Sequence, residues 1–329
     1  MTAIAPHISD FLQERLPAQI GASSNTCDSY AYAFQLLFEF AASRYHVAPC
    51  ELNLEQIDAT LIMHFLEHLE TARKNSARTR NARLIAIKSF MKFIQYRVPS
   101  LLNQVQTVLA IPSKKTNNRL ISYLTIAEME QILRQPDTAK KSGIRDRAMI
   151  NLCFSAGLRV SELIALGMSS ITFGATSCVH IVGKGRKERV LPIWPQTATD
   201  LNNWLSVREK AECPLLFLNA KSQKFSRSGF EYILNKHVLS AIKCCPSLEK
   251  KAVSPHVLRH TAAMLVLQAT GDIRKVALWL GHASIQSTEA YLRADPTEKL
   301  NAIESIVPPS LKPGKFNAPD KLLALLNNR

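Results

Sequence analysis

Residues 254–260 read SPHVLRH, and this short stretch guides the interpretation of the whole chain. Ser254 is a typical N-cap residue, and proline, found here at position 255, is favoured at the first position of a helix. The spacing then places His256 and Arg259 on one face of the first turn, because residues three apart in a helix are neighbours. A helix N-terminus flanked by a histidine and an arginine is suited to bind an anion.

Three further clusters accompany this stretch. AGLRVSEL places Arg159 at the start of a helix, and VGKGRKERVLPI places Lys184 at the turn of a hairpin. LGHASIQSTEAY places His282 after a helix-ending glycine, with Tyr291 nine residues further on. Each cluster alone has an ordinary explanation: a surface arginine, a solubilising turn lysine, a C-terminal cap or a core tyrosine.

Together, the side chains in these clusters suit the cleavage of a phosphodiester without a metal. Two arginines offer planar, permanently charged forks for the phosphate. A lysine can protonate a leaving oxygen, a histidine can move protons near neutral pH, and a tyrosine can form a covalent phosphoryl link. The sequence has no GxxxxGK[ST] phosphate loop, and no Asp/Glu set for two-metal catalysis lies near these residues. The clusters therefore indicate metal-free phosphoryl transfer.

No metal and no other cofactor is expected. His256 and His260 have a spacing that occurs in metal sites, but no third ligand is placed to help them. Seven cysteines form an odd set without a CxxC pair, which favours reduced thiols in a cytosolic protein. No apolar run approaches the roughly 18 residues that span a bilayer, and the N-terminus lacks the layout of a signal peptide. We therefore expect a cytoplasmic protein without a membrane partner.

The chain is basic, with 41 Lys and Arg against 26 Asp and Glu and a net charge of +15. Eleven Lys and Arg residues lie between Glu70 and Glu128, where there is no acidic residue. A solvated helix face is the plain explanation of such a run, but the missing acids favour a surface for a polyanion. The residues predicted to bind DNA are Arg73, Lys74, Arg78, Arg80, Arg83, Lys88, Lys92, Lys114 and Lys115.

The length of 329 residues indicates two domains. Helical periodicity predicts an N-terminal helical domain over residues 1–111, and the polar, proline-containing stretch 112–120 is interpreted as a linker. Residues 121–307 form the second domain, in which the runs CVHIVG and ERVLPI predict a hairpin between helices. Residues 308–329 are left as a C-terminal tail. The expected fold class is mostly α with a small antiparallel β-sheet.

The order of the four clusters resembles the tyrosine recombinase (phage integrase) family. The segments GLRVSEL, GKGRKERVLPI, SPHVLRH and LGHASI are most similar to Xer-type and related bacterial integrases. The similarity is close over about residues 120–300 and looser over the N-terminal helices. It implies a two-domain C-shaped clamp around DNA, made of an N-terminal SAM-like helical bundle and a mixed α/β catalytic domain.

The resemblance also implies roles at the phosphate. Arg159 and Arg259 would bind the scissile phosphate, and His282 would hydrogen-bond to it in the transition state. Glu162, three residues after Arg159, is either a brace of this site or a surface residue.

The resemblance implies the remaining roles as well. Tyr291 would attack the phosphate to give a 3′-phosphotyrosyl intermediate. Lys184 would protonate the leaving 5′-oxygen, and His256 would assist proton transfer.

The implied function is site-specific recombination of double-stranded DNA through a Holliday junction, without metal or ATP, for integration or excision of a mobile element. Xer-like dimer resolution is the alternative within the same chemistry. A type IB topoisomerase shares the residue set, and a DNA-binding protein without catalysis is the alternative from another class.

The resemblance further implies an assembly. Four protomers would hold two sites, with a partner recombinase or an accessory DNA-bending protein as a candidate addition. Relatives pass a C-terminal helix to the neighbouring protomer, and residues 320–328 are the candidate segment for this exchange.

Overall fold

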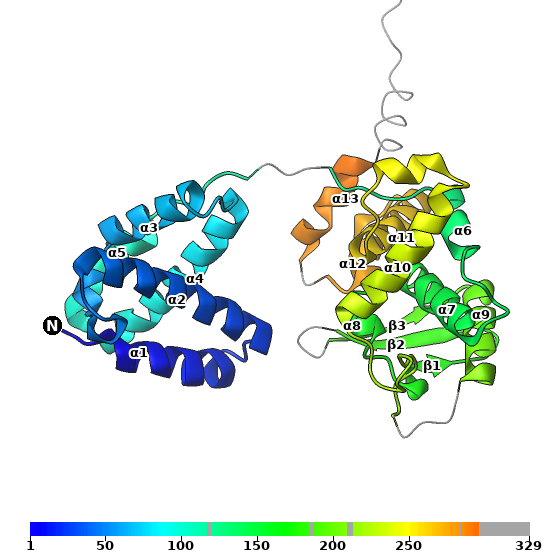
Figure 1. The fold of residues 1–329 in the computed structure, drawn as a ribbon, viewed down its shortest axis with the longest axis horizontal. Helices are drawn as coiled ribbons and strands as arrows, with labels where there is room; N and C mark the ends of the chain where they lie inside the picture. Colours follow the sequence, from blue (N-terminus) through cyan, green and yellow to red (C-terminus); the bar gives the residue numbers. More distant parts are fainter. Residues whose placement is uncertain (117–119, 184–186, 209–212, 283, 296–329) are drawn as a thin grey trace, which may run out of the picture. The chain divides into compact units, whose positions relative to one another are not determined.

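The computed structural model describes residues 1–116, 120–183, 187–208, 213–282 and 284–295 (Figure 1). The chain divides into two compact units, residues 1–118 and 119–329, and each is described by itself. The division falls within the stretch 112–120 that the sequence assigns to a linker. The tail 308–329 lies outside the described residues.

The first unit is a bundle of helices around an aromatic core. Its elements are α1 (Ile4–Asp10), the π-helical η1 (Phe11–Gln19), α2 (Ser24–Tyr45), η2 (Pro49–Glu51), η3 (Leu54–Gln56), α3 (Ala59–Thr71), α4 (Ala77–Arg97), η4 (Pro99–Leu101) and α5 (Leu102–Ala110). Phe11, Phe34 and Phe90 are fully buried and meet with ring centroids 5.4–6.0 Å apart. Polar residues begin two of the helices, because Asp58 and Ser76 accept hydrogen bonds from the first turns of α3 and α4.

In the second unit, helices surround a small β-sheet. Its elements are α6 (Ile126–Leu133), α7 (Lys141–Ser155), α8 (Val160–Leu163), η5 (Met168–Ser170), β1 (Ile171–Thr172), β2 (Cys178–Val182), β3 (Glu188–Pro192), α9 (Pro195–Val207), α10 (Arg227–Ile242), η7 (Pro246–Lys250), α11 (Pro255–Thr270), α12 (Ile273–Leu280), η8 (Ile285–Ser287) and α13 (Glu289–Ala294). The predicted fold class, mostly α with a small antiparallel sheet, is confirmed.

The sheet has the order β1-β2-β3, and both of its pairings are antiparallel. In β2, Val179 and Ile181 are buried while their neighbours are less so, which is the period of two expected of a half-buried strand. Ile181 pairs with Arg189, and this register places Arg189 on β3 one residue beyond the start of the strand. The predicted hairpin is present, and its turn, residues 184–186, lies outside the described residues.

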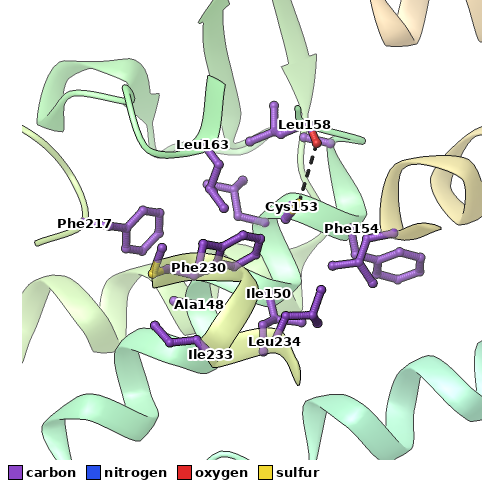
Figure 2. Close-up of a cluster of buried hydrophobic side chains, with 14 of the residues drawn as sticks. Ala148, Ile150, Cys153, Phe154, Leu158, Leu163, Phe217, Phe230, Ile233 and Leu234 are labelled. Atoms are coloured by element: carbon purple, nitrogen blue, oxygen red, sulfur yellow. Dashed lines mark hydrogen bonds between the residues drawn. The ribbon is translucent and has the colours of Figure 1, made fainter. Parts of the chain in front are cut away.

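The core of the second unit is built on α7, which is buried along most of its length. Figure 2 shows α7 residues Ala148 and Ile150 among side chains of other elements, including Phe230 of α10. The Cys153 thiol donates to the Leu158 carbonyl at 3.6 Å, and burial raises the pKa of this thiol to about 12. A thiol so hard to ionise is a packing residue and not a nucleophile. The loop that leaves this core carries Arg159.

Candidate active site

The carboxylate of Glu162 lies at the centre of a group of arginines. Arg159, the N-cap of α8, donates to Oε1 from Nη1 at 2.8 Å and to Oε2 from its backbone N–H at 2.9 Å. Arg189 of β3 binds the same carboxylate with two bonds, Nη1 to Oε1 at 3.1 Å and Nη2 to Oε2 at 2.8 Å. Burial alone would raise the pKa of Glu162, but the hydrogen bonds from Arg189 and Arg159 leave it lowered. Glu162 is therefore a charged brace, the first of the two alternatives that the sequence left open.

Arg259 of α11 is the most deeply buried of these three arginines. Its guanidinium donates to the carbonyl of Gly157 at 2.6 Å and to that of Leu280 at 2.7 Å, and it lies 3.9 Å from the Glu162 carboxylate. Burial, followed by the positive charge of Arg159, lowers the pKa of Arg259 to about 10, so it stays charged at neutral pH. Its backbone acceptors fix its position without neutralising its charge.

The Tyr291 hydroxyl belongs to the same site. The ring is buried against a small core formed by α11 and α12, and its hydroxyl lies 3.0 Å from Nδ1 of His260. Burial raises the pKa of Tyr291, while the charges of Arg259 and Arg159 lower it in part. The phenol is therefore neutral near pH 7 and lies within the electrostatic field of the two arginines.

Both histidines beside Tyr291 are neutral imidazoles near pH 7. Burial is the main reason that the pKa of His260 and that of His282 are each lowered to about 4, and the nearby Arg259 lowers both further. A neutral imidazole has one ring nitrogen that can accept a proton, which a charged one lacks. Nδ1 of His282 makes a hydrogen bond with the Thr288 hydroxyl at 2.8 Å, and its ring stacks on that of Tyr291 with centroids 6.4 Å apart.

The structure therefore brings together four of the predicted catalytic residues: Arg159, Arg259, His282 and Tyr291. His256 has an exposed side chain on the first turn of α11, one turn before His260. Lys184 lies outside the described residues.

Sequence reasoning missed three residues of this site: Arg189, His260 and Thr288. The signal for Arg189 was the period of two in β3, because Leu191 is buried two residues later and side chains alternate across a sheet. The pair His256 and His260 was weighed only as a metal site. Within the described ranges, no group of three or more His, Cys, Asp or Glu side chains is placed to hold a metal ion.

The basic residues of the first unit have different environments. Arg73 donates to the Tyr32 hydroxyl at 3.3 Å, and the Arg83 guanidinium lies 4.8 Å from the centre of the same ring. Tyr32, which the sequence analysis did not select, is thus an exposed aromatic between two cations. Of the other residues predicted to bind DNA, those with exposed side chains are Lys74, Arg78, Lys92, Lys114 and Lys115, of which Lys114 pairs with Glu70 at 2.7 Å.

Arg80 and Lys88 direct their charges into the protein. Arg80 is buried and donates to the carbonyl of Pro112 at 3.0 Å. Lys88 donates from Nζ to the carbonyls of Leu109 and Ile111, at 2.7 and 2.5 Å, and so caps the end of α5. Burial lowers the pKa of Lys88, and the charges of its basic neighbours lower it further. Both side chains act as structural cations of the helical bundle.

In the part of the chain that the structure describes, no helix is long and apolar enough to cross a membrane.

Comparison with known proteins identifies the family. A model of the phage integrase family matches residues 122–298, and one of the N-terminal SAM-like domain of phage integrases matches residues 8–97. The chain is 41% identical to y4rC, a protein of Sinorhizobium fredii named as an integrase/recombinase, over 99% of this chain and 98% of that protein. It is 30% identical to the tyrosine recombinase XerC of Pelotomaculum thermopropionicum, over 87% of this chain and 92% of that protein.

Solved structures share the fold. A XerH recombinase bound to a palindromic difH substrate after cleavage aligns with a TM-score of 0.67 at 23% identity, over 87% of this chain and 81% of that one. A lambda integrase from a tetramer bound to a Holliday junction aligns with a TM-score of 0.63 at 16% identity, over 88% of this chain and 77% of that one. The fold, the arginine-rich site and the family matches agree with the resemblance seen in the sequence. The chain belongs to the phage integrase family of tyrosine recombinases, enzymes that break and rejoin DNA strands at specific sites.

Proposed function

We propose that this recombinase cuts DNA through a covalent 3′-phosphotyrosyl intermediate on Tyr291. The proposal rests on the position of the Tyr291 hydroxyl, which is hydrogen-bonded to the neutral His260 and lies in the electrostatic field of two arginines. A phenol placed in this way can lose its proton as it attacks, because an acceptor and a stabilising charge are both within reach.

The proposed step forms one bond to phosphorus and breaks another. Arg159 and Arg259 hold the non-bridging oxygens of the phosphate, and Tyr291 forms a bond from its oxygen to phosphorus. The phenolic proton passes to a histidine, with His260 in direct contact and His256 one turn away.

The bond to the 5′-oxygen then breaks, and Lys184 supplies a proton to that oxygen. Attack by a 5′-hydroxyl of a partner strand reverses the step, so no metal and no ATP is consumed.

The first experiment uses a supercoiled plasmid that carries the DNA flanking this gene. Wild-type protein and Tyr291→Phe are incubated with it without metal, and SDS-stable, protease-sensitive adducts and topological products are measured. Adducts and recombinants from the wild type alone support the proposal. Relaxation without recombinants favours a topoisomerase, and binding without either product favours a DNA-binding protein without chemistry.

The proposed biological role is integration or excision of a mobile element in the cytoplasm. It is supported by the protein named integrase/recombinase that matches along nearly the full chain. The alternative, dimer resolution, is supported by the XerC relatives. A plasmid dimer and a pair of separate plasmids, each carrying the flanking DNA, distinguish the two roles. Products from separate molecules support integration, whereas products from the dimer alone support resolution.

The proposed DNA contact of the first unit is the exposed basic surface around Tyr32. Arg73 and Arg83 contact the tyrosine, and the exposed cations Lys74, Arg78 and Lys92 supply further charge elsewhere on the same unit. An aromatic ring with cations around it suits a phosphate backbone and its sugars. Arg80 and Lys88 are left out of this surface because their charges bind backbone carbonyls.

Assembly into a tetramer on two sites is proposed to use an apolar groove of the second unit. The groove has a volume of roughly 1070 Å³ and is lined by α6, α11 and α12, with Leu278 76% exposed. Such an apolar surface marks an interaction site. We assign the segment 320–328 of a neighbouring protomer as its occupant, because Leu322, Leu325 and Leu326 follow the spacing of one helix face.

This assembly has its own test. Leu278→Glu and removal of residues 308–329 are each expected to abolish the tetrameric complex on DNA in gel-shift and light-scattering measurements, while single-site binding persists. Leu239→Glu changes a leucine that is 60% exposed and lies outside the groove, on α10, and is the matched control. A tetramer that survives both changes would refute this use of the groove. In that case a partner recombinase or an accessory DNA-bending protein becomes the next candidate for holding two sites together.

A further inference from the structure

Arg189 is the member of the arginine group that none of the roles above uses. Its side chain is 10% exposed, against 33% for Arg159, although both bind the same carboxylate. Arg159 is therefore the more accessible of the two arginines to a phosphate from DNA. The Glu162 carboxylate thus has one solvent-facing partner, Arg159, and one buried partner, Arg189.

We propose that Arg189 is a positioning residue that fixes Arg159 for phosphate binding by holding both oxygens of Glu162. The proposal rests on the phosphate-binding role proposed for Arg159. Arg189 makes two near-parallel bonds to the carboxylate, at 3.1 and 2.8 Å, which set the plane and the rotation of the Glu162 side chain. Glu162 in turn holds Arg159 at its backbone N–H and at Nη1.

The charge balance explains why a second arginine is needed. A carboxylate that faced Arg159 alone could take both of its bonds from that guanidinium and compete with the DNA phosphate for it. Arg189 occupies the two oxygens from the buried side, which leaves Arg159 with a single side-chain bond to Oε1. The arrangement keeps Arg159 oriented while leaving donors for a second anion.

Two glycines give Arg189 the room that this geometry requires. A Cβ atom at Gly281 would lie 3.1 Å from Nη1 of Arg189, and one at Gly183 would lie 3.4 Å from the same atom. Gly281 also has a φ of +64°, which favours glycine, and it directly precedes His282. The guanidinium therefore lies directly against the backbone at Gly281, and a side chain at that position would displace it from Glu162.

The test compares Arg189→Lys with the wild type on a duplex that carries the site located in the plasmid assay. Lysine keeps the charge but offers a point contact in place of a fork, so it cannot hold both oxygens of Glu162. We expect Arg189→Lys to form the covalent adduct about a hundredfold more slowly, because small misplacements of a catalytic group have effects of about that size. DNA affinity and melting temperature should stay close to those of the wild type. Arg134→Lys alters an exposed arginine that pairs with Glu130, and it should leave the rate unchanged.

A second substrate separates positioning from general damage to the fold. When the scissile phosphate is replaced by a methylphosphonate, one negative oxygen is removed, so Arg159 and Arg259 have less negative charge to stabilise. The difference in rate between Arg189→Lys and the wild type should then shrink, as it should for Arg159→Ala. An undiminished difference on this substrate would show that Arg189 does not act through the arginine that binds the phosphate, and would overturn the proposal.

A double variant tests the route through Glu162. If Arg189 acts by holding Glu162, Arg189→Lys combined with Glu162→Gln should lose little more activity than Glu162→Gln alone. Losses that multiply would contradict this route. The inference and the proposed function fail in distinguishable ways: no adduct from the wild type defeats the proposed function, whereas an active wild type with an equally active Arg189→Lys defeats only the inference.

Discussion

The hydroxyl of Tyr291 lies 3.0 Å from Nδ1 of His260, a residue on the second turn of α11 whose first turn carries His256. One helix therefore presents two histidines. The sequence predicts a role for His256, whereas the histidine in contact with the proposed nucleophile is His260. Because burial lowers the pKa of His260 to about 4, its imidazole is neutral and able to accept the phenolic proton.

We predict that His260→Ala slows formation of the covalent adduct by about 10²–10⁴-fold, the usual contribution of a positioned general base. DNA affinity should change little, because the contact of His260 is with Tyr291 and not with an exposed surface. Single-turnover adduct formation and a gel shift on the same duplex measure the two effects. If His256→Ala is the slower variant and His260→Ala reacts normally, the proton passes to His256 instead.

The two arginines proposed to bind phosphate, Arg159 and Arg259, should respond differently to truncation. Arg159→Ala is expected to lose about 10²–10³-fold in cleavage with little loss of stability, because its side chain is partly exposed. Arg259→Ala should lose cleavage and also stability, because it leaves the buried carbonyls of Gly157 and Leu280 without their donor. Adduct assays and thermal unfolding of the two variants check the contrast, which equal melting temperatures would contradict.

The basic residues of the first unit should separate into two groups in a salt titration. Lys74→Gln, Arg78→Gln and Lys92→Gln should each weaken DNA binding and reduce the slope of log affinity against log salt by roughly 1. Lys88→Met should leave that slope unchanged and lower stability instead, because Nζ of Lys88 caps the end of α5. If Lys88→Met lowered the slope as much as the other three substitutions do, Lys88 would have to be counted among the residues that contact DNA.

The second unit should lose stability as the pH falls from about 6.5 to about 4. In the unfolded chain His260 and His282 protonate near their ordinary pKa of 6.5, whereas in the folded site burial delays protonation until the pKa of about 4. The unfolded state therefore binds more protons in this window, and the free energy of unfolding falls with the pH. His282→Asn should make melting temperature less dependent on pH between 7 and 5.

The control for this experiment is His46→Asn. His46 is exposed and has a φ of 55°, a conformation that asparagine also tolerates. Its replacement should leave the pH dependence of melting unaltered. An unchanged dependence in His282→Asn as well would show that His282 is not a source of the effect.

Local sequence signals predict part of the fold and part of the candidate site. The N-terminus of α11 follows from local signals, since Ser254 accepts from the backbone N–H of Val257 as an N-cap should. The sequence predicts the candidate site residues Arg159, Arg259, His282 and Tyr291 because motifs mark them. Arg80 and Lys88 could not be assigned from the sequence, because the carbonyls that bind them lie 32 and 21–23 residues away along the chain. Whether a lysine meets solvent or a helix end depends on packing that a local pattern does not contain.

The hydrogen bond between His282 and Thr288 has a consequence for control. Thr288 is buried and forms the N-cap of α13, and Tyr291 follows three residues later on that helix. A displacement of this short helix would carry the tyrosine and pull on the histidine through the same bond. The positions of the tyrosine and of the histidine therefore both depend on the same short segment, and a change in that segment would affect both groups together.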